Sequence, residues 1–478
     1  MELIFIISAF VLAAPVCLLS KKRIVIEVVS ALSSFVALAG SVISAFKASA
    51  LNVYAPFPFF SIDGLGAIIM LIIGSVGFAT AIYSIQYLRK ETKKSIIGFT
   101  RVKQYFVLLN LFLLAMFLAI TADSPIFAWI SIEATTLSTA FLISFYNKPG
   151  TIEAAWKYLI INSVGLLLGF FGTILYFTSV DSGGGFVSWQ TLLLNIGNLD
   201  PLIAKIAFVF VLIGYGTKVG LAPMHTWLPD AHSKAPAPIS ALLSGVLLNV
   251  AFVVVLRFKI ITDAAVGQSF SQGLLIVFGL LSIIIASLLI LNQRSYKRLL
   301  AYSSIENMGI ISLGFGFGGL GIFAAILHMI YHSFIKSSLF FSAGTVLLKY
   351  SSTKIANIKG MLTALPVTSI LFALGLLAIS GIPPFGIFFT KFYILAEGIK
   401  THPVAGFTAI FFMSLVFIGF LKHASGMIFG EKPETCEAGE SSVWLIAPTI
   451  LFLLAVIVLS FYLPPFLSAL INNAVTQY

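Results

Sequence analysis

The chain has 478 residues, of which 59% are hydrophobic and only 9% are charged. Soluble domains carry about 25% charged residues, so this composition excludes a soluble globular protein and predicts an integral membrane protein. The formal net charge is +11. The basic residues, however, lie in short clusters between apolar segments, with no basic and aromatic patch for nucleic acid. Two cysteines, Cys17 and Cys436, cannot build a disulfide framework or a thiolate metal centre, and no redox-cofactor motif is present, so we expect no cofactor.

Apolar segments of about 20 residues, the length that crosses a hydrocarbon core of roughly 30 Å, recur along the chain. They predict an all-α polytopic membrane protein with about 14 transmembrane helices. The first segment lacks a basic start and a small-residue cleavage site, so we expect a transmembrane helix rather than a signal peptide. The predicted spans are residues 2–20, 24–46, 65–88, 104–121, 125–146, 153–179, 201–222, 236–258, 270–291, 297–318, 321–348, 363–395, 404–428 and 442–468.

Two spans contain residues that interrupt a helix. Gly220 and Pro223 stand at the end of the seventh span, and Gly381 and Pro384 stand inside the twelfth. Proline removes a backbone hydrogen bond and clashes with the preceding turn, so we expect helices 7 and 12 to be discontinuous.

The loops differ in charge. Those that follow odd-numbered spans carry most of the lysines and arginines, which predicts that they face the cytoplasm and that both termini lie on the opposite side. The expected location is the cytoplasmic membrane of a prokaryote. The last odd-numbered loop, residues 431–440, is acidic and is expected to be a solvated turn. The basic residues of the other odd-numbered loops include Lys21, Lys22, Arg23, Arg89, Lys90, Lys93, Lys94, Lys148, Lys234, Arg294, Lys297, Arg298, Lys349 and Lys354.

An internal repeat is indicated by a shared spacing. Lys391 follows Lys218 by 173 positions, and the same spacing separates Glu306 from Glu133 and Lys422 from Asn249. The two broken helices are five spans apart, and an odd number of spans reverses the direction of the second unit. The spacing therefore predicts an inverted repeat of two five-helix units. The expected organisation is three N-terminal helices (1–103), a first repeat (104–260), a second repeat (261–430), and an acidic loop with the last helix (431–478).

A charged side chain at the centre of a bilayer costs at least ~2.5–3.5 kcal/mol, so each one needs a reason. Glu133 lies deep in the fifth span, and Lys218 lies at the break of the seventh. A neighbouring carboxylate and amine can exchange a proton or hold each other's charge. The alternative is a static ion pair that joins two helices, although an apolar pair would do this at less cost.

His328, His332 and Lys336 follow one another at a spacing of four, which places them on one face of the eleventh helix. Histidine titrates near neutral pH, so such a row can relay protons through water. Two histidines four residues apart could also bind zinc, but no third ligand stands at a suitable spacing, and we expect no metal.

The remaining candidates are Lys391, which has one expected role, and three residues with two possible roles each, namely Lys157, Lys422 and His232. Lys391 follows the second break and is expected to end the relay on the non-cytoplasmic side. Lys157 could hold the cytoplasmic entry or be an ordinary interfacial charge. Lys422 could belong to the relay or extend to the membrane surface. His232 could lie on the entry path or shape the turn after the seventh span.

Three stretches resemble a known family: GTKVGLAPMHTWLPDAHSKAPAPISALLSG, RLLAYSSIENMG and LHMIYHSFIKSSLFF. They are similar to the antiporter-like proton-pumping subunits of respiratory complex I, a family that includes Mrp-type sodium/proton antiporters and membrane-bound nickel–iron hydrogenases. The resemblance covers about residues 65–430 and implies 14 helices, two inverted repeats and a hydrophilic axis parallel to the membrane. It also implies relay roles for Glu133, Lys218, His328, His332 and Lys391.

The chain departs from the family pattern at two positions. Asn249 stands where complex I members usually carry a lysine, and Asn307 stands where some members carry a histidine. An asparagine can hydrogen-bond water but cannot take up a proton, so the connection between the two halves at Asn249 would have to run through water or through other groups. Glu306, next to Asn307 in the sequence, could substitute for that histidine as the titratable group.

The departures favour a hydrogenase-associated relative, of the hydrogenase-4 or formate-hydrogenlyase type. The expected function is proton translocation by a subunit that holds no redox centre. Its expected partners are other membrane subunits and, through them, a peripheral arm of hydrogenase or NADH dehydrogenase type. Two alternatives remain open: a subunit of a gradient-driven sodium/proton antiporter, and a transport-inactive scaffold.

Overall fold

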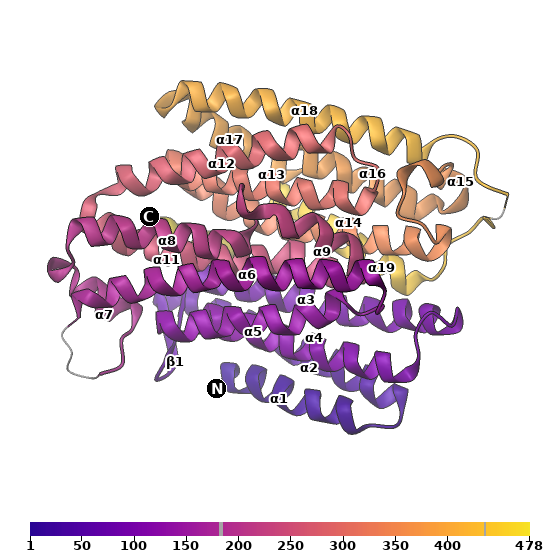
Figure 1. Ribbon diagram of the computed structural model, residues 1–478, viewed down its shortest axis with the longest axis horizontal. Coiled ribbons are helices and arrows are strands. Elements are labelled where there is room, and N and C mark those ends of the chain that lie inside the picture. Colours follow the sequence, from indigo (N-terminus) through magenta and orange to yellow (C-terminus); the bar gives the residue numbers. More distant parts are fainter. Residues whose placement is uncertain (181–184, 435) are drawn as a thin grey trace.

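The apolar segments form long helices that lie side by side, from α1 at one edge of the molecule to α18 at the other (Figure 1). The computed structural model describes residues 1–180, 185–434 and 436–478. In these ranges, 12 helices are long and apolar enough to cross a membrane. The long helices are α1 (Glu2–Leu19), α2 (Arg23–Leu51), α3 (Gly64–Lys93), α4 (Phe99–Thr121), α5 (Pro125–Ile143), α6 (Pro149–Tyr176), α8 (Pro201–Val219), α11 (Leu248–Val266), α12 (Gln268–Ile290), α13 (Tyr296–Phe317), α14 (Leu320–Tyr350), α18 (Pro403–Ile428) and α19 (Val443–Phe461). All of them except α13 belong to the 12.

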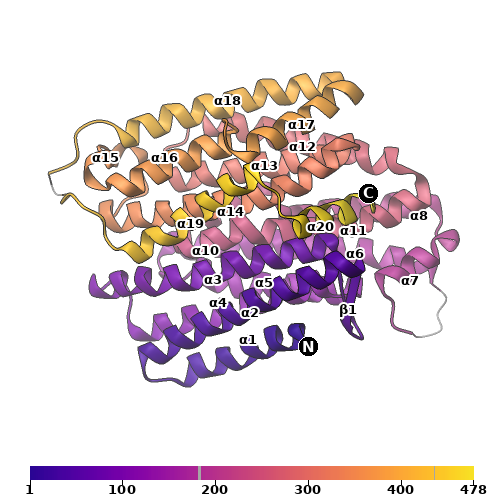
Figure 2. The same cartoon turned by 180° about the vertical axis from the view of Figure 1, so that it is seen from behind.

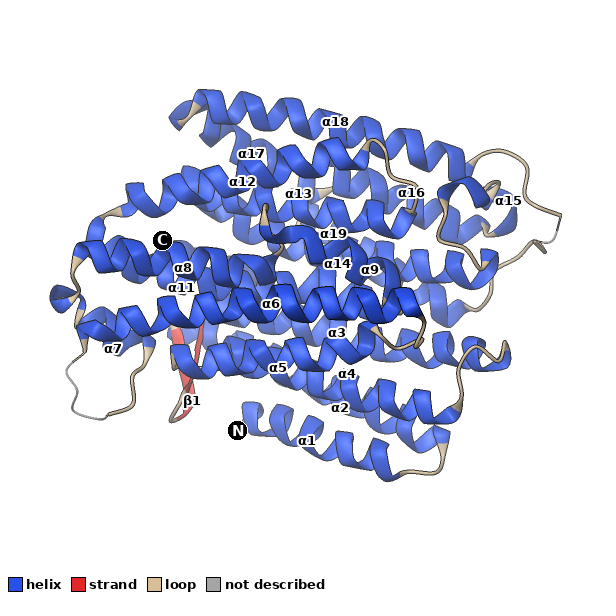
Figure 3. Ribbon diagram, viewed as in Figure 1, coloured by secondary structure: helices blue, strands red, loops and turns tan. Residues whose placement is uncertain are grey.

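The prediction of an all-α membrane protein is confirmed, with small departures. A hairpin of β1 (Val53–Phe57) and β2 (Phe60–Asp63) precedes α3 and is seen in red in Figure 3. Lys259, which lies just beyond the eighth predicted span, and Arg257, at the end of that span, are both buried inside α11. The last predicted span is also two helices, α19 and the short α20 (Pro465–Val475), because Pro464 and Pro465 interrupt it.

The seventh predicted span is interrupted where glycine and proline predict it. Helix α8 ends at Gly220, whose φ of +80° lies in the left-handed region that glycine adopts without strain. The chain then continues through a 3₁₀ turn (Met224–Thr226) to the short α9 (Trp227–Lys234). Next come α10 (Ala237–Leu242) and a π-helical turn (Leu243–Leu247), which leads directly into α11.

The twelfth predicted span is interrupted in the same way. A short α15 (Met361–Ala364) precedes α16 (Pro366–Ser380), which ends at Gly381 with a φ of +88°. Helix α17 (Gly386–Thr401) resumes after the two prolines. Neither α16 nor α17 is long enough to cross a membrane alone, so they form one interrupted crossing.

The loops after odd-numbered spans gather at one end of the helices. The Lys90 amine donates to the Ser441 carbonyl at 2.6 Å, and the Lys349 amine donates to the Gly439 carbonyl at 2.9 Å. Both chain termini lie toward the opposite end, beside the β hairpin and α7 (Trp189–Leu194), as Figure 2 shows from behind. The basic loops therefore lie at one end of the bundle and the two termini at the other.

Helices α6 and α8 pack unusually closely against each other. A Cβ atom at Gly214 in α8 would lie 2.2 Å from the backbone nitrogen of Gly169 in α6, so the two backbones touch there. Small residues allow such approaches between membrane helices. The helix that contains Asn249 is buried all round, at the centre of the bundle.

Candidate functional site

The first buried charge lies at the end of α8. The Lys218 side chain is fully buried, and its amine donates to Thr136 Oγ1 at 2.8 Å and to Tyr158 OH at 2.6 Å. The amine also lies 4.7 Å from the centre of the Tyr158 ring. A buried polar group is costly unless it is hydrogen-bonded, and these two hydroxyls supply the bonds.

Tyr158 is itself held firmly. Its hydroxyl is 2.5 Å from Thr139 Oγ1, and its ring packs edge-on against Trp227 at 5.1 Å. The Trp227 indole donates to the Thr217 carbonyl, beside Lys218, at 2.8 Å. Tyr158 is neutral, so the search for charged residues in the sequence does not identify it. A signal was present, since Tyr331 follows Tyr158 at the same spacing of 173 positions.

Glu133, the expected partner of Lys218, lies apart from it on the half-buried face of α5. Ser163 donates to Glu133 Oε1 at 3.0 Å, and Oε2 is buried without a partner among the described residues. In the part of the chain that the structure describes, Glu133 and Lys218 form no ion pair. The expected ion pair is therefore not formed in this structure. The Lys218 amine instead donates to the hydroxyls of Thr136 and Tyr158.

The second half holds its lysine differently. Lys391, in α17, forms an ion pair with Glu306 of α13, with Nζ 3.0 Å from Oε1. The same amine donates to the Ile379 and Ser380 carbonyls, which end α16, at 3.1 and 3.4 Å. Carbonyls at a helix C-terminus lack intrahelical partners and attract cations. Lys391 thus bridges a carboxylate and the broken helix end.

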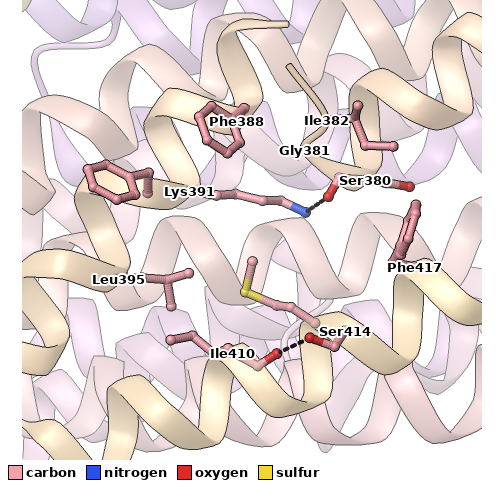
Figure 4. Close-up of a pocket in the computed structure, with 11 residues that line it drawn as sticks. Ser380, Gly381, Ile382, Phe388, Lys391, Leu395, Ile410, Ser414 and Phe417 are labelled. Atoms are coloured by element: carbon pink, nitrogen blue, oxygen red, sulfur yellow. Dashed lines mark hydrogen bonds between the residues drawn. The ribbon is translucent and has the colours of Figure 1, made fainter. Parts of the chain in front are cut away.

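A cavity of about 370 Å³ lies beside Lys391, between the broken helix and α18. Figure 4 shows the Lys391 amine at Ser380, with Ser414 on the opposite wall. Most of the other lining residues are apolar, including Phe388, Leu395 and Phe417. This cavity provides room for water next to the end of the charge chain.

An unbroken hydrogen-bonded chain leads from His328 to Lys391. His328 Nε2 lies 3.0 Å from Asn307 Oδ1, and Asn307 Nδ2 donates to Glu306 Oε2 at 2.6 Å. Glu306 Oε1 accepts from Lys391 at 3.0 Å. Asn307 therefore occupies a linking position. Glu306 and Asn307, which are adjacent in the sequence, are both members of this hydrogen-bonded chain.

The hydrogen-bond partners of His328 indicate which of its two ring nitrogens carries a proton. Asn307 Nδ2 also donates to the Ser303 carbonyl at 2.6 Å, so the amide oxygen must face His328, and Nε2 must carry a proton. On the other side, Nδ1 lies 2.8 Å from Thr390 Oγ1, which itself lies 3.0 Å from the Ile387 carbonyl. The threonine proton can point to either neighbour. His328 can therefore gain a second proton without moving its ring.

Three further polar residues occupy the centre between the halves. Lys336 is fully buried and donates to the Leu300 carbonyl and, at 2.6 Å, to Ser303 Oγ. His332 is fully buried, and neither ring nitrogen has a partner among the described residues. Asn249 donates to Ser333 Oγ at 2.9 Å, which joins α11 to α14. The three predicted α14 groups thus lie in the interior.

Of the three candidates with two possible roles, two lie at the surface and one lies in the interior. Lys157 is 49% exposed and pairs with Glu153 at 2.6 Å, so it lies at the surface. Lys422 is also exposed and reaches the Leu291 carbonyl at 3.5 Å, which fits a side chain that extends to the membrane surface. His232 is fully buried, and its ring stacks on Phe340 at 5.0 Å.

The helix breaks do not follow the spacing of 173 positions. Gly381 follows Gly220 by only 161 positions. Lys218 therefore precedes its break, on α8, whereas Lys391 follows its break, on α17. Each lysine borders a break, but the two lie on opposite sides of their breaks.

Across residues 1–180, 185–434 and 436–478, no group of three or more histidine, cysteine, aspartate or glutamate side chains is placed to hold a metal ion. The side chains described above supply amines, carboxylates, imidazoles and hydroxyls. Such groups can bind, release and relay protons.

A bundle of membrane-spanning helices with two interrupted helices and a buried row of titratable groups defines an antiporter-like membrane subunit. The family model for the NADH:quinone oxidoreductase/Mrp antiporter transmembrane region matches residues 122–418. The model for the N-terminus of chain 5 of complex I NADH-ubiquinone oxidoreductase matches residues 56–95. The chain belongs to the NADH:quinone oxidoreductase/Mrp antiporter transmembrane family.

Individual relatives agree with this assignment. The chain is 40% identical over 378 residues to the hydrogenase-4 component F homolog of Methylacidiphilum infernorum (isolate V4), covering 78% of each protein. Its fold matches a chain of the archaeal membrane-bound sulfane sulfur reductase with a TM-score of 0.88 and 21% identity, over 100% of this chain and 96% of that one. It also matches a chain of the Mrp complex of Dietzia sp. DQ12-45-1b with a TM-score of 0.86 and 18% identity, over 100% and 97% of the two chains.

Proposed function

We propose that this chain translocates protons as a subunit of a redox-driven membrane complex of the hydrogenase-4 type. The observation that carries the proposal is the buried chain His328–Asn307–Glu306–Lys391, in which each member is hydrogen-bonded to the next. Asn307 cannot take up a proton, so it would position His328 and Glu306, and a proton would pass between those two through water. A structural ion pair alone would need only Glu306 and Lys391. The additional histidine, with a hydroxyl that can reverse its bond, is what a relay requires.

The proposed movement begins at the lysines. The Lys218 amine is held by two hydroxyls, and Glu133, which lies apart from it, has one carboxylate oxygen without a partner among the described residues, so the proposal gives the amine two alternative positions. A change in the charge of Glu133 would shift the amine between them and change its affinity for a proton. Reduction or oxidation in a partner subunit would supply that change, since this chain is expected to hold no redox centre.

The centre of the route needs water. His332 is buried without protein partners on its ring, and Asn249 has a buried oxygen without one in the described ranges. Buried polar groups require hydrogen bonds, so we expect ordered water to join these two residues. Asn249 would then hold water in place without binding the proton itself, and Lys391, beside its cavity, would release it.

The proposal includes location and partners. The basic loops at one end of the bundle would face the cytoplasm of a prokaryote, and both termini would lie outside it. Other membrane subunits would connect the chain to a peripheral hydrogenase or NADH dehydrogenase arm. The hydrogenase-4 homolog at 40% identity supports the hydrogenase arm.

The first experiment isolates the native complex in mild detergent through a tag and identifies the partners by mass spectrometry. A hydrogenase arm supports the proposal. Recovery of Mrp-type membrane subunits alone, with sodium-driven proton exchange in vesicles, would replace it with gradient-driven antiport. Recovery of the complex with no proton movement in either assay would leave only a scaffold.

The second experiment removes one amine from the site. Lys218→Ala should abolish coupled proton translocation in reconstituted vesicles while the complex still assembles, because Lys218 is the buried amine of the first half. Lys422→Ala is the matched control, since Lys422 is exposed, and it should translocate normally. Normal translocation by Lys218→Ala would refute the mechanism.

A further inference from the structure

Two buried glutamates lie at the basic end of the bundle, and they differ sharply. Glu27, in α2, is 1% exposed and accepts from Arg23 at 2.8 Å and from Arg89 at both oxygens. Both of its oxygens are thus ion-paired. Such a carboxylate fastens α2 to α3 and has no place for a proton.

Glu91, near the end of α3, is 3% exposed but forms no ion pair in the described part of the chain. Tyr146 donates to its Oε1 at 2.6 Å, and its Oε2 is buried with no partner there. An unpaired buried carboxylate is costly, and protonation removes the cost. Its free oxygen is therefore a ready site for a proton.

Glu91 also lies close to solvent. Tyr146 is only half-buried, and the next residues, Asn147 and Lys148, are exposed. Tyr87 lies on the inner side, with its hydroxyl 3.2 Å from that of Tyr146. The carboxylate is thus one side chain away from the surface that carries the basic loops.

On the inner side, polar groups continue towards the relay. Lys297, 1% exposed, interacts electrostatically with Glu91, and its amine donates to the Ala235 carbonyl at 2.6 Å. Three residues before Ala235 stands His232, whose ring lies 5.0 Å from that of Phe340. The Lys336 amine lies 5.4 Å from the centre of the same ring. Lys297 and Lys336 both act electrostatically on His232.

We propose that Glu91 is the proton-loading group at the basic end of the bundle, and that it feeds the relay through Lys297 and His232. The proposal rests on the proposed function. A proton from solvent beside Tyr146 binds Oε2, while the Tyr146 bond to Oε1 remains. It then passes to Lys297 when that amine is neutral, which restores the carboxylate. Lys148, Tyr87 and Tyr146 are the other titratable groups that act on Glu91.

The test compares Glu91→Gln with Glu27→Gln in the complete complex. Glu91→Gln keeps the shape but cannot bind a proton, so translocation should fall about a hundredfold, the loss expected for a missing proton-transfer group. Glu91→Asp should retain part of the activity. Glu27→Gln removes a structural carboxylate and should lower stability without a specific loss of translocation by the complexes that assemble.

A chemical readout covers the case in which Glu91→Gln does not assemble. Dicyclohexylcarbodiimide reacts with protonated carboxyl groups in apolar surroundings. In the unaltered complex it should label Glu91, increasingly as pH falls, and leave Glu27 unlabelled. Absence of label on Glu91, or normal translocation by Glu91→Gln, would overturn the proposal. Lys391→Ala separates the two failures. If it is inactive while Glu91→Gln is normal, only the loading role fails, and if both are normal, the proposed function fails as well.

Discussion

Two hydroxyls distinguish how the two halves hold their lysines. Lys218 rests on Tyr158 and Thr136, whereas Lys391 rests on a carboxylate and two carbonyls. At the spacing of 173 positions, Thr136 corresponds to Gly309, which has no side chain. Tyr158 corresponds to Tyr331, whose hydroxyl donates to the Leu459 carbonyl at 2.8 Å. The second half therefore lacks the hydroxyl support that the first half provides.

Tyr158→Phe should consequently impair transport. It removes one of the two hydrogen bonds to a buried amine, a loss of about 1.5–3 kcal/mol. The equilibrium between the present position of the Lys218 amine and its other positions therefore shifts about tenfold or more. We expect slower proton translocation with a displaced pH profile, measured in reconstituted vesicles from pH 5 to 9. Tyr331→Phe is the control and should leave the profile unchanged. Equal profiles for both variants would show that the Tyr158 hydroxyl has no part in positioning the lysine.

At the scale of single residues, charged and titratable site residues could be recognised in the sequence more readily than neutral ones. Glu306, His328 and Lys391 could be selected from the sequence because charged and titratable groups are rare inside membranes. Thr136, one partner of Lys218, could not, since hydroxyl residues are common in such helices, and Tyr158, the other, is marked only by its spacing of 173 positions from Tyr331. Whether Lys218 meets Glu133 or the hydroxyls depends on a few ångströms of helix placement, which no spacing in the sequence encodes.

At the scale of helices, the contact between α6 and α8 sets the distance between Tyr158 and Lys218. Gly214→Ala would place a methyl group 2.2 Å from Gly169 N and 2.4 Å from Gly169 Cα, so the helices must separate. Overpacking of this kind costs about 1–3 kcal/mol. We expect a lower unfolding temperature in detergent together with reduced translocation.

Gly216→Ala is the matched control, two residues along the same helix. Its new Cβ would meet Met224 Cε at 3.4 Å and Leu221 Cδ1 at 3.7 Å, and the flexible methionine side chain can accommodate the closer contact. We expect its thermal stability to be unchanged or slightly higher, because alanine favours a helix over glycine. A similar loss in both variants would contradict the role given to the α6–α8 contact.

The breaks themselves were predictable, and their relation to the lysines was not. Glycine and proline mark both interruptions because their backbone properties are local. The position of a lysine before one break and after the other depends on how many residues each half-helix contains. The shared spacing of 173 positions suggested equivalence, and the spacing of 161 between Gly220 and Gly381 shows its limit.

At the scale of the whole molecule, the orientation can be measured with single cysteines. The natural Cys17 and Cys436 are 0% and 5% exposed, so a membrane-impermeant maleimide should leave them unlabelled. Lys93→Cys lies at the end with the basic loops, and Leu194→Cys lies at the opposite end in α7, where Leu194 is 77% exposed. We expect the first to be labelled only in inside-out vesicles and the second only in right-side-out vesicles. The reverse pattern would invert the proposed topology.

The π-helical turn at Leu243–Leu247 has a consequence for the direction of everything after it. Such a turn takes in one residue more than an α-helical turn, so it rotates the following helix by about 100° relative to an uninterrupted one. The bond from Asn249 to Ser333 depends on that rotation, as do the buried directions of Arg257 and Lys259. Deleting one residue here would shorten the chain very little, but it would aim the whole of α11 at different neighbours.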